Sequence, residues 1–576
     1  MSAAVQTIWC ELLAATLADA GIATCVISPG SRSTPLVAAL AGESRLELVT
    51  IIDERAAAFF ALGAARATGK PAALVCTSGT AAAHYLPALV EASLAGVPMI
   101  AITADRPPEL LACGASQTID QIDLYGGFVR GAFDLGAPAP QALRGMRRTI
   151  VQAITLASGP HPGPVHLEVP LRKPLEPAAP STDAEHALAR DAVALHGAVP
   201  IAPPRLAPDA SAITALAEAI SAEPDGVIIA GALPAGFPRE AAFEVARRTG
   251  YPLIAEAPSQ LRFGPRPDGV VVIDHADLVP LTRRPAPKLV LQLGAEPVAA
   301  SWPAWIASLG TAQRWVIGGA TWADPEGTAR VILGEPGDVL AGLTRIERRS
   351  TVRTSAWLDT WRDAEASAAI AAARAIEAAP TSEVAVLRAV LAAVPAGAAV
   401  QIGNSLPIRV VDHVPGGGAP RTVLSQRGAA GIDGLIASAA GATRAGAPVL
   451  LVLGDVSFAH DLGGLLAARC ASAPLAILVI DNRGGQIFAG LPVAKAKLGA
   501  AFERHFITAP EIDPAVVAAA LGARAVTATS PAAAATAVAT ALATFGVTVI
   551  HAPVSVSGAH DVRRNAIELF ARGATP

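Results

Sequence analysis

Short apolar runs alternate with stretches of helical spacing along the whole chain. Five runs rich in β-branched residues lie between about residues 22 and 170: CVISPG, LELVTIID, PAALVCTSG, PMIAITAD and GPVHLEVP. Residues 55–67 and 80–94, between these runs, have the apolar spacing of helices. Strands that alternate with helices predict a parallel sheet covered by helices on both faces.

Two further blocks repeat this alternation. Their apolar runs are GVIIAG, PLIAEA, VVVID, KLVLQLG and RWVIGG, then AAVQIGN, TVLSQRG, PVLLVLGD, LAILVIDN and VTVIHAPVS. The proline-rich residues 174–208 predict an irregular linker, and a polar, basic stretch over 345–354 closes the second block. The fold class is therefore α/β, with three consecutive α/β domains and mainly parallel sheets over 1–180, 205–345 and 370–576.

Composition narrows the class of protein. Hydrophobic residues make up 52% of the chain and charged residues 16%, with a net charge of −4. No block of Lys and Arg marks a nucleic-acid or membrane surface, and no apolar run reaches the roughly 18–20 residues of a membrane span. The N-terminus lacks the basic flank of a signal peptide. We expect a cytoplasmic enzyme with a small-molecule substrate.

The cysteines do not suggest a disulfide framework or a zinc site. There are five of them, at 10, 25, 76, 113 and 470, and none forms a CxxC pair. We expect buried thiols.

Oxygen donors beside glycines follow two of the apolar runs in the third block. Gly454-Asp455 ends one run, and Asn482 and Gly484 follow the next. Such donors at the carboxyl ends of buried strands suit Mg²⁺ on a diphosphate, with Asp455, Asn482 and the main-chain carbonyl of Gly484 as ligands. The alternative is a pair of helix N-caps. The joint occurrence, together with a helix expected over 461–468 that would offer its N-terminus to an anion, favours the metal site.

Glu54 is the second candidate, at the junction of an apolar run and a predicted helix. A carboxylate at a helix start is commonly a surface cap. The strongly apolar sequence around Glu54 predicts partial burial instead, and a buried carboxylate needs a specific partner.

Glu54 in the first block and Gly454-Asp455 with Asn482 in the third together resemble the thiamine-diphosphate-dependent enzymes. The resemblance implies that Mg²⁺, or Mn²⁺ in its place, binds the diphosphate through the third block. It also implies that Glu54 hydrogen-bonds the aminopyrimidine ring and favours the imino tautomer of the cofactor. Further cofactor contacts are implied at Thr77, Gly79, Ser405, Ile432, Val456, Ser457 and Gly485.

Four longer motifs resemble one family, the 2-succinyl-5-enolpyruvyl-6-hydroxy-3-cyclohexene-1-carboxylate synthases of the menaquinone pathway. They lie at 27–36, 103–110, 403–409 and 427–434. The resemblance implies a pyrimidine-binding, a middle and a diphosphate-binding domain in that order. It further implies a homodimer or homotetramer with active sites at subunit interfaces. The reaction implied is decarboxylation of 2-oxoglutarate and addition of the succinyl group to isochorismate.

Arginines in loops after predicted strands meet the demand for carboxylate binding, because a planar guanidinium binds a carboxylate bidentately. A solvated surface charge is the alternative for any one of them. The resemblance assigns Ser405, Arg409 and Arg427 to the intermediate derived from 2-oxoglutarate. It assigns Ser31, Arg32, Arg106 and Gln117 to isochorismate.

Ile432 matches the family's large aliphatic residue that bends the cofactor and brings its amino nitrogen close to C2, although a core isoleucine would give the same pattern. The chain departs from the family at two places. No basic residue follows KLVLQLG, where residues 294–302 are GAEPVAASW, and Ser116 replaces a common Asn. Histidines 84, 460 and 560 receive no catalytic role.

Two other functions remain open from the residues. A 2-oxoacid decarboxylase or acetolactate synthase would use the same cofactor, although its small apolar acyl group has less need of several arginines. An inactive paralogue that binds a diphosphate is the other, and the joint presence of Glu54, Asp455 and Asn482 argues against it.

Overall fold

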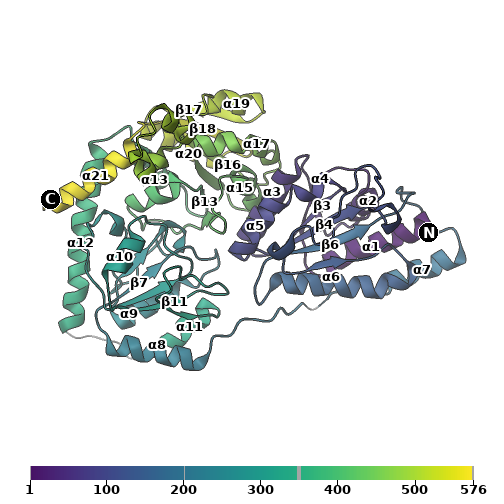
Figure 1. Ribbon diagram of the computed structural model, residues 1–576, viewed down its shortest axis with the longest axis horizontal. Helices are drawn as coiled ribbons and strands as arrows, with labels where there is room; N and C mark the ends of the chain where they lie inside the picture. The colour runs from purple at the N-terminus through teal and green to yellow at the C-terminus, as the bar shows by residue number, and fades with distance from the viewer. Residues whose placement is uncertain (1, 200, 347–351, 574–576) are drawn as a thin grey trace. The chain divides into compact units, whose positions relative to one another are not determined.

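The computed structural model describes residues 2–199, 201–346 and 352–573, so that most of the polar stretch at 345–354 lies outside the described residues. Three six-stranded sheets follow one another along the chain, and every strand pairing within them is parallel (Figure 1). Their strand orders are β2-β1-β3-β4-β6-β5, β12-β11-β10-β7-β8-β9 and β14-β13-β15-β16-β18-β17. The α/β fold class with three parallel sheets is confirmed.

The first sheet is formed by six strands near the N-terminus. They are β1 (Thr24–Ile27), β2 (Glu47–Thr50), β3 (Ala72–Cys76), β4 (Met99–Asp105), β5 (Ala132–Asp134) and β6 (Pro164–Pro170). The helices of this region are α1 (Ala3–Asp19), α2 (Thr34–Gly42), α3 (Glu54–Thr68), α4 (Thr80–Ala83), α5 (Leu86–Ala95), α6 (Leu143–Ser158) and α7 (Asp183–Val193). Helix α1 packs against α2, α6 and α7, whereas α3 packs against α5. The strands β3, β4 and β6 are buried throughout, as expected for the centre of a parallel sheet.

The second sheet comprises β7 (Gly226–Ala230), β8 (Leu253–Ala255), β9 (Val272–Ile273), β10 (Leu289–Leu293), β11 (Gln313–Ile317) and β12 (Arg330–Ile332). Its helices are α8 (Ala210–Ala222), α9 (Arg239–Thr249), α10 (Trp302–Ser308), α11 (Pro336–Leu343) and the long α12 (Val352–Glu377). Helix α12 runs beside the C-terminal helix α21 (Gly558–Ala571), as Figure 1 shows.

The third sheet comprises β13 (Ala399–Ile402), β14 (Val423–Ser425), β15 (Val449–Gly454), β16 (Leu475–Asp481), β17 (Arg524–Thr527) and β18 (Val547–Pro553). Its helices include α13 (Glu383–Ala393), α14 (Leu406–Val410), α16 (Asp455–His460), α18 (Ala500–Phe502), α19 (Pro514–Ala520) and α20 (Pro531–Leu542). Two more helices arise between its strands, α15 (Leu435–Ala442) and α17 (Leu462–Ala468).

The chain divides into two compact units that do not follow the sequence strictly. The first unit contains the residues up to Pro204 together with Gln426–Gly446 and Asp461–Ser472, so helices α15 and α17 belong to it. The second unit contains Arg205–Ser425, Ala447–His460 and the residues from Ala473 onward. The boundaries of the three predicted domains stay a prediction.

Helices α3 and α15 cross in the first unit with their backbones in contact. A Cβ atom at Gly63 of α3 would lie 1.9 Å from the carbonyl oxygen of Ser438, and one at Gly441 of α15 would lie 1.9 Å from that of Phe60. Only glycine fits at either position, since interiors are packed without spare volume. The start of α3, which carries Glu54, is therefore tied to α15.

The strands that the hydrophobic pattern missed all lie at sheet edges. These are β5, β12 and β17, one in each sheet, and most of their residues are exposed or only partly buried. An edge strand has a neighbour on one side only, so that it needs fewer apolar residues and gives a weaker signal.

Three other expectations were wrong in detail. The proline-rich stretch 174–208 contains helix α7, which begins with a capping box between Thr182 and Glu185. The helix expected over 80–94 is two helices, because Pro87 starts a new one. Cys10, Cys25 and Cys76 are buried, but Cys113 is exposed and Cys470 only partly buried.

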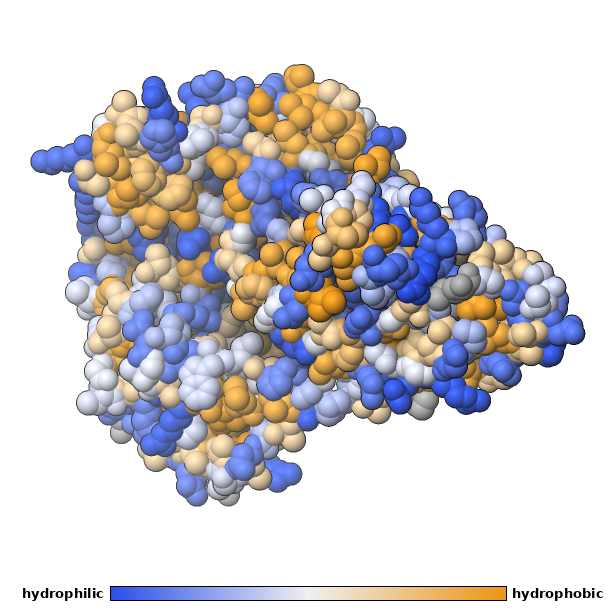
Figure 2. Space-filling model, turned by 45° about the vertical axis from the view of Figure 1, so that its right-hand side comes forward, coloured by the Kyte–Doolittle hydropathy of each residue, from blue (hydrophilic) through white to orange (hydrophobic). Residues whose placement is uncertain are grey.

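On the face shown in Figure 2, apolar residues lie in patches that hydrophilic residues interrupt. Among the described residues, no helix combines the length and the apolar character that crossing a membrane requires.

The close crossing of α3 and α15 leads to a stability prediction. Gly63→Ala should lower the free energy of unfolding by about 1–3 kcal/mol, because the added methyl group would overlap a backbone carbonyl. Gly42→Ala is the control, since a Cβ at this helical glycine meets nothing within 4 Å. Urea denaturation measures both variants. A Gly63→Ala protein as stable as the Gly42→Ala protein would contradict the crossing.

Candidate active site

Predicted site residues of the second unit follow three neighbouring strands of the third sheet. Ser405 and Arg409 follow β13, Asp455 follows β15, and Asn482 follows β16. Because parallel strands place their carboxyl ends at one edge, these side chains share that edge. Ser405 has a φ of +72°, and its carbonyl accepts a hydrogen bond of 2.7 Å from Nη1 of Arg409. A positive φ in a residue other than glycine is a strained backbone of the kind found at ligand sites.

Asp455 is buried and held by backbone amides. Its Oδ2 accepts a 2.6 Å hydrogen bond from the N–H of Gly484, and its Oδ1 accepts one of 2.9 Å from Val456. Burial raises the pKa of this carboxyl to about 6; nearby Asp481 adds to the shift and the Gly484 N–H opposes it. Gly484 has a φ of +112°, and a Cβ there would lie 2.3 Å from the carbonyl oxygen of Ile507, so glycine is required.

A second buried carboxyl, Glu383, adjoins this pair and was not found from the sequence. Burial raises its pKa to about 7, the charge of Asp455 adds to the rise, and the Asn482 side chain opposes it. Both carboxylate oxygens of Glu383 are shielded from solvent. Glu383 is the first residue of helix α13, where an acidic residue is ordinary, and this explains why nothing in the sequence singled it out.

The donor set at this edge fits a cation bound partly by phosphate oxygens. In the described part of the chain, no group of three or more His, Cys, Asp or Glu side chains is arranged to hold a metal. The expected ligands are different: the Asp455 carboxylate, the Asn482 amide oxygen and the carbonyl of Gly484. The buried carboxyls of Asp455 and Glu383 and the half-buried carboxyl of Asp481 supply the negative charge that attracts a cation.

Glu54 is the first residue of α3 in the first unit and is partly buried. Asp53 caps this helix by accepting hydrogen bonds from the N–H groups of Arg55 and Ala56. The Glu54 charge contributes, after burial, to raising the pKa of Cys76 and Tyr85, which places it near the end of β3. Its carboxylate is thus free of the capping role that Asp53 fills.

The loops after β1, β3 and β4 of the first sheet meet around Ser78. The backbone N–H of Arg32 donates to Oγ1 of Thr77 (3.2 Å). Arg106 donates from Nη1 to Oγ of Ser78 (2.5 Å), and Gln117 donates from Nε2 to the carbonyl of Ser78 (3.0 Å). Burial lowers the pKa of Arg32, and the charge of Arg106 lowers it further. The charge of Asp105 opposes this shift, and the electrostatic interaction of the two guanidiniums favours an anion beside them.

Other polar contacts support these loops. Gly79 donates its N–H to Oε1 of Gln121 (2.8 Å), and Gln121 in turn donates to the buried carboxylate of Glu168 (3.1 Å). Nη2 of Arg106 donates a hydrogen bond to the backbone carbonyl of Ser116 (3.0 Å). This contact therefore does not depend on the Asn that is common at position 116 in the family. Ser31 is exposed.

Two buried carboxylates of the first unit hold the loop that carries Arg427 and Ile432. Glu91 accepts hydrogen bonds from the N–H groups of Gly428 (3.1 Å) and Ala429 (2.7 Å). Asp461 accepts from the N–H groups of Ile436 (2.8 Å) and Ala437 (3.4 Å) through Oδ2. Asp461 thereby caps helix α15, whose own N-cap residue is Gly434 and has no side chain to offer.

The anion-binding role expected for the N-terminus of the helix over 461–468 stays a prediction. Asp461 and helix α17 lie in the first unit, and Asp461 serves the start of α15. The helix that begins directly at the end of β15 is α16, with Asp455 as its first residue. Val456 and Ser457 follow in the same helix, while Gly485 packs under Phe506 and Phe488.

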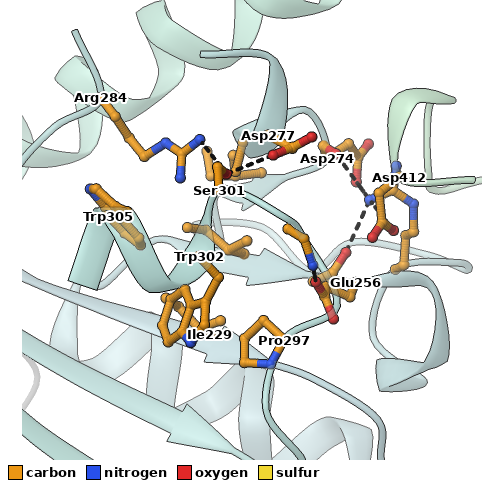
Figure 3. Close-up of a pocket in the computed structure, with 16 residues that line it drawn as sticks. Ile229, Glu256, Asp274, Asp277, Arg284, Pro297, Ser301, Trp302, Trp305 and Asp412 are labelled. Carbon is orange, nitrogen blue, oxygen red and sulfur yellow. Dashed lines mark hydrogen bonds and ion pairs between the residues drawn. The ribbon is translucent and has the colours of Figure 1, made fainter. Parts of the chain in front are cut away.

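A small cavity lies at the carboxyl ends of β7, β8 and β9 in the second unit. Figure 3 shows Ile229, Trp302 and Trp305 on its apolar side, and Asp274 with Asp412 on the other. Its volume of ≈ 30 Å³ holds about two water molecules. The Glu256 carboxylate accepts hydrogen bonds from residues 298 and 299, in the stretch that lacks the family's basic residue.

Comparisons with known proteins identify the relatives of this chain. Two family models match the chain: the thiamine pyrophosphate enzyme N-terminal TPP binding domain at residues 9–124 and the C-terminal TPP binding domain at residues 410–552. The 2-succinyl-5-enolpyruvyl-6-hydroxy-3-cyclohexene-1-carboxylate synthase of Sorangium cellulosum is 41% identical over 90% of this chain and 88% of its own length. That of Geobacillus kaustophilus is 38% identical over 97% of both.

The chain belongs to the 2-succinyl-5-enolpyruvyl-6-hydroxy-3-cyclohexene-1-carboxylate synthase family. It is a transferase that carries both thiamine pyrophosphate-binding domains of this family.

Solved structures share the fold of this synthase family at low sequence identity. Benzoylformate decarboxylase from Polynucleobacter necessarius superposes with a TM-score of 0.71 at 16% identity, covering 96% of this chain and 98% of that one. A putative thiamin diphosphate-dependent enzyme from Mycobacterium smegmatis gives 0.67 at 20% identity, covering 94% and 98%.

The cap of α15 in this synthase predicts a pH dependence of stability. Burial raises the pKa of Asp461 to about 6, above the roughly 3.9 of an unfolded chain. The folded protein therefore binds this proton more tightly, and that stabilisation is lost as the pH rises from about 4 to about 6. Asp461→Asn keeps an oxygen acceptor and cannot ionise. Its free energy of unfolding, relative to the unchanged protein, should rise across this range by about 2–3 kcal/mol.

Urea denaturation between about pH 4 and 7 measures this difference. Asp513→Asn controls for the altered cap, because Asp513 accepts the same pair of backbone hydrogen bonds at the exposed start of α19. A difference for Asp461→Asn that stays constant with pH would show that the carboxyl does not titrate in this window.

Proposed function

We propose that this synthase uses thiamine diphosphate and Mg²⁺ to decarboxylate 2-oxoglutarate and to add the succinyl group to isochorismate. The product is 2-succinyl-5-enolpyruvyl-6-hydroxy-3-cyclohexene-1-carboxylate, an intermediate of menaquinone biosynthesis, and the compartment is the cytoplasm. The observation that carries the proposal is that one chain combines a diphosphate-type edge at Asp455 and Asn482 with Glu54 at a helix start and with arginines in the strand-end loops.

In this proposal Asp455, Asn482 and the carbonyl of Gly484 hold Mg²⁺, and Mn²⁺ can take the same oxygen ligands. The hydrogen bonds that Asp455 accepts from the N–H groups of Gly484 and Val456 support it, because they fix the orientation of the carboxylate. The bound cofactor supplies the carbanion centre at which a 2-oxoacid loses carbon dioxide. Ile432, before α15, is the residue proposed to press on the cofactor.

Glu54 is proposed to exchange a proton with the cofactor's aminopyrimidine ring. Its partial burial supports this role, because a carboxylate with few water contacts binds a ring nitrogen more strongly. The capping of α3 by Asp53 leaves Glu54 available for that bond.

The arginines are proposed to divide between two carboxylate substrates. Ser405, Arg409 and Arg427 would bind the carboxylate end derived from 2-oxoglutarate. Arg32, Arg106 and Gln117, with Ser31 at the rim, would bind isochorismate. The mutual electrostatic effect of Arg32 and Arg106 supports the second group, since an anion between them relieves their repulsion.

The assembly is proposed to be a homodimer or homotetramer with active sites at subunit interfaces. Exposed apolar side chains on the first unit support a covered surface. Ile52, just before Glu54, is 81% exposed, and Leu94 is 50% exposed. Single exposed apolar residues are ordinary, but one this bare beside a site residue favours burial by a partner.

The proposal separates the roles of Glu54 and Asp455. Glu54→Gln should lower the turnover number by about 10²–10⁴-fold and leave Mg²⁺-dependent binding of thiamine diphosphate intact, because Glu54 acts on the ring. Asp455→Ala should weaken that binding. Steady-state kinetics and calorimetric titration of the cofactor measure the two effects, with exposed Glu176→Gln as a neutral control. Wild-type turnover in Glu54→Gln would exclude the proposed mechanism.

The division of the arginines has its own test. Arg409→Gln should raise the KM for 2-oxoglutarate by about 10–100-fold, and Arg106→Gln should do the same for isochorismate, because each loses a charged hydrogen bond to a carboxylate. Each variant serves as the control for the other. Initial rates with one substrate varied at a time measure both constants, and equal effects on both substrates would refute the division.

A further inference from the structure

The second unit contains a cavity that takes no part in the site described above. Its volume is ≈ 170 Å³. The residues that line it are Ala235, Arg239, Gln260, Gly397, Ala398, Pro420, Arg421 and Thr422. Space of this kind holds one water molecule in about 10–15 Å³, so the cavity accommodates roughly ten waters or a small organic ion. Its lining includes two arginines and no acidic residue.

Both arginines are anchored around Phe263, and each leaves most of its donors unused. Arg239 donates from Nη2 to the carbonyl of Phe263 (2.6 Å). Arg421 stacks over the Phe263 ring, with its Cζ 5.3 Å from the ring centre, and donates from Nη2 to Val394 at 3.4 Å. The Nε atoms of both guanidiniums are buried without a hydrogen-bond partner. A guanidinium has five N–H donors, so both retain donors for a ligand.

Several guanidiniums elsewhere in the second unit are paired with carboxylates. Arg262 lies 3.8 Å from Asp274 and 3.7 Å from Asp412, and it also donates to four backbone carbonyls. Arg314 lies 3.1 Å from Asp324. Arg563 similarly lies 2.8 Å from Asp277.

No such ion pair involves Arg239 or Arg421 among the residues that the structure describes. Burial lowers the pKa of both side chains, and only the exposed Glu240 offsets this shift for Arg239. A charge withdrawn from water is costly unless a counter-ion accompanies it. Both arginines are half-buried, and the cavity that they line has room for an anion to supply the negative charge.

We propose that this cavity is a binding site for a small dianion that offers oxygen acceptors to two guanidiniums, as a phosphate or a short dicarboxylate does. The planar fork of each arginine matches the two oxygens of such a group. Thr422 also lines the cavity, and a threonine hydroxyl can provide one neutral donor.

An anion bound in this cavity would help to hold strand β14 in place. Thr422 accepts a backbone hydrogen bond from Val400 (2.9 Å), and Gln260 bonds to both the N–H (3.2 Å) and the carbonyl (2.7 Å) of Val423. An anion held by Arg421 therefore fixes the start of the edge strand that leads into the loop of Arg427. This inference does not depend on the proposed reaction.

Calorimetric titration of the full chain tests the site, with Mg²⁺ and thiamine diphosphate present so that the diphosphate edge is occupied. Inorganic phosphate and succinate are the two probes, each at an ionic strength matched with chloride. Saturable binding of one ion per chain is expected for at least one probe, weakened at least tenfold in Arg239→Gln and in Arg421→Gln. Arg283→Gln removes the same charge at an exposed position of the same unit and should leave binding unchanged.

A second, independent test adds a negative charge to the cavity lining and leaves both arginines in place. Thr422→Asp places a carboxylate in the lining, so it should abolish binding of both probes and raise the melting temperature measured without them. Binding of phosphate alone identifies a tetrahedral oxyanion site, and binding of succinate alone identifies a dicarboxylate site. The proposal is overturned if neither probe binds saturably or if both glutamine variants bind the probe as tightly as the unchanged protein. It is also overturned if Arg283→Gln loses as much binding as those two variants.

Discussion

The first unit depends on the contact between helices α3 and α15, whose backbones meet through Gly63 and Gly441. Helix α3 begins at Glu54, and the loop before α15 carries Arg427 and Ile432. Because these helices leave no room between them, the positions of the three residues are coupled through packing. The buried carboxylates of Asp461 and Glu91 complete the arrangement by binding backbone N–H groups at both ends of that loop.

The second unit keeps several acidic groups close together at the carboxyl-end edge of the third sheet. Asp455, Asp481 and Glu383 adjoin one another, and burial raises the pKa of Asp455 and Glu383. Backbone N–H groups, an amide side chain and His551, 2.9 Å from Asp481, partly compensate this charge. Negative charge kept in place at the cost of stability is what a cation-dependent site requires. Among the described residues of the same unit, no ion pair joins a carboxylate to Arg239 or Arg421, which line the other cavity.

Much of the fold follows from local signals in the sequence. Fifteen of the strands coincide with apolar runs rich in β-branched residues, as the sequence predicts. The polar candidate residues follow the carboxyl ends of these strands, which the sequence also predicts. The edge strands β5, β12 and β17 were missed because half-exposed strands need few apolar residues. Asp461, Glu91 and Glu383 were missed for another reason. Asp461 and Glu91 bind backbone groups of distant loops, Glu383 is buried only by the folded unit, and no local pattern records such contacts.

The proposed reaction joins a dicarboxylate 2-oxoacid to isochorismate at a single site. The most direct measurement is the consumption of isochorismate, followed by its ultraviolet absorbance, as each of four components is omitted in turn. The account predicts consumption only when thiamine diphosphate, Mg²⁺, 2-oxoglutarate and isochorismate are all present, with one carbon dioxide released per isochorismate consumed. Turnover of pyruvate in place of 2-oxoglutarate, or cofactor binding with no consumption of isochorismate, would contradict it.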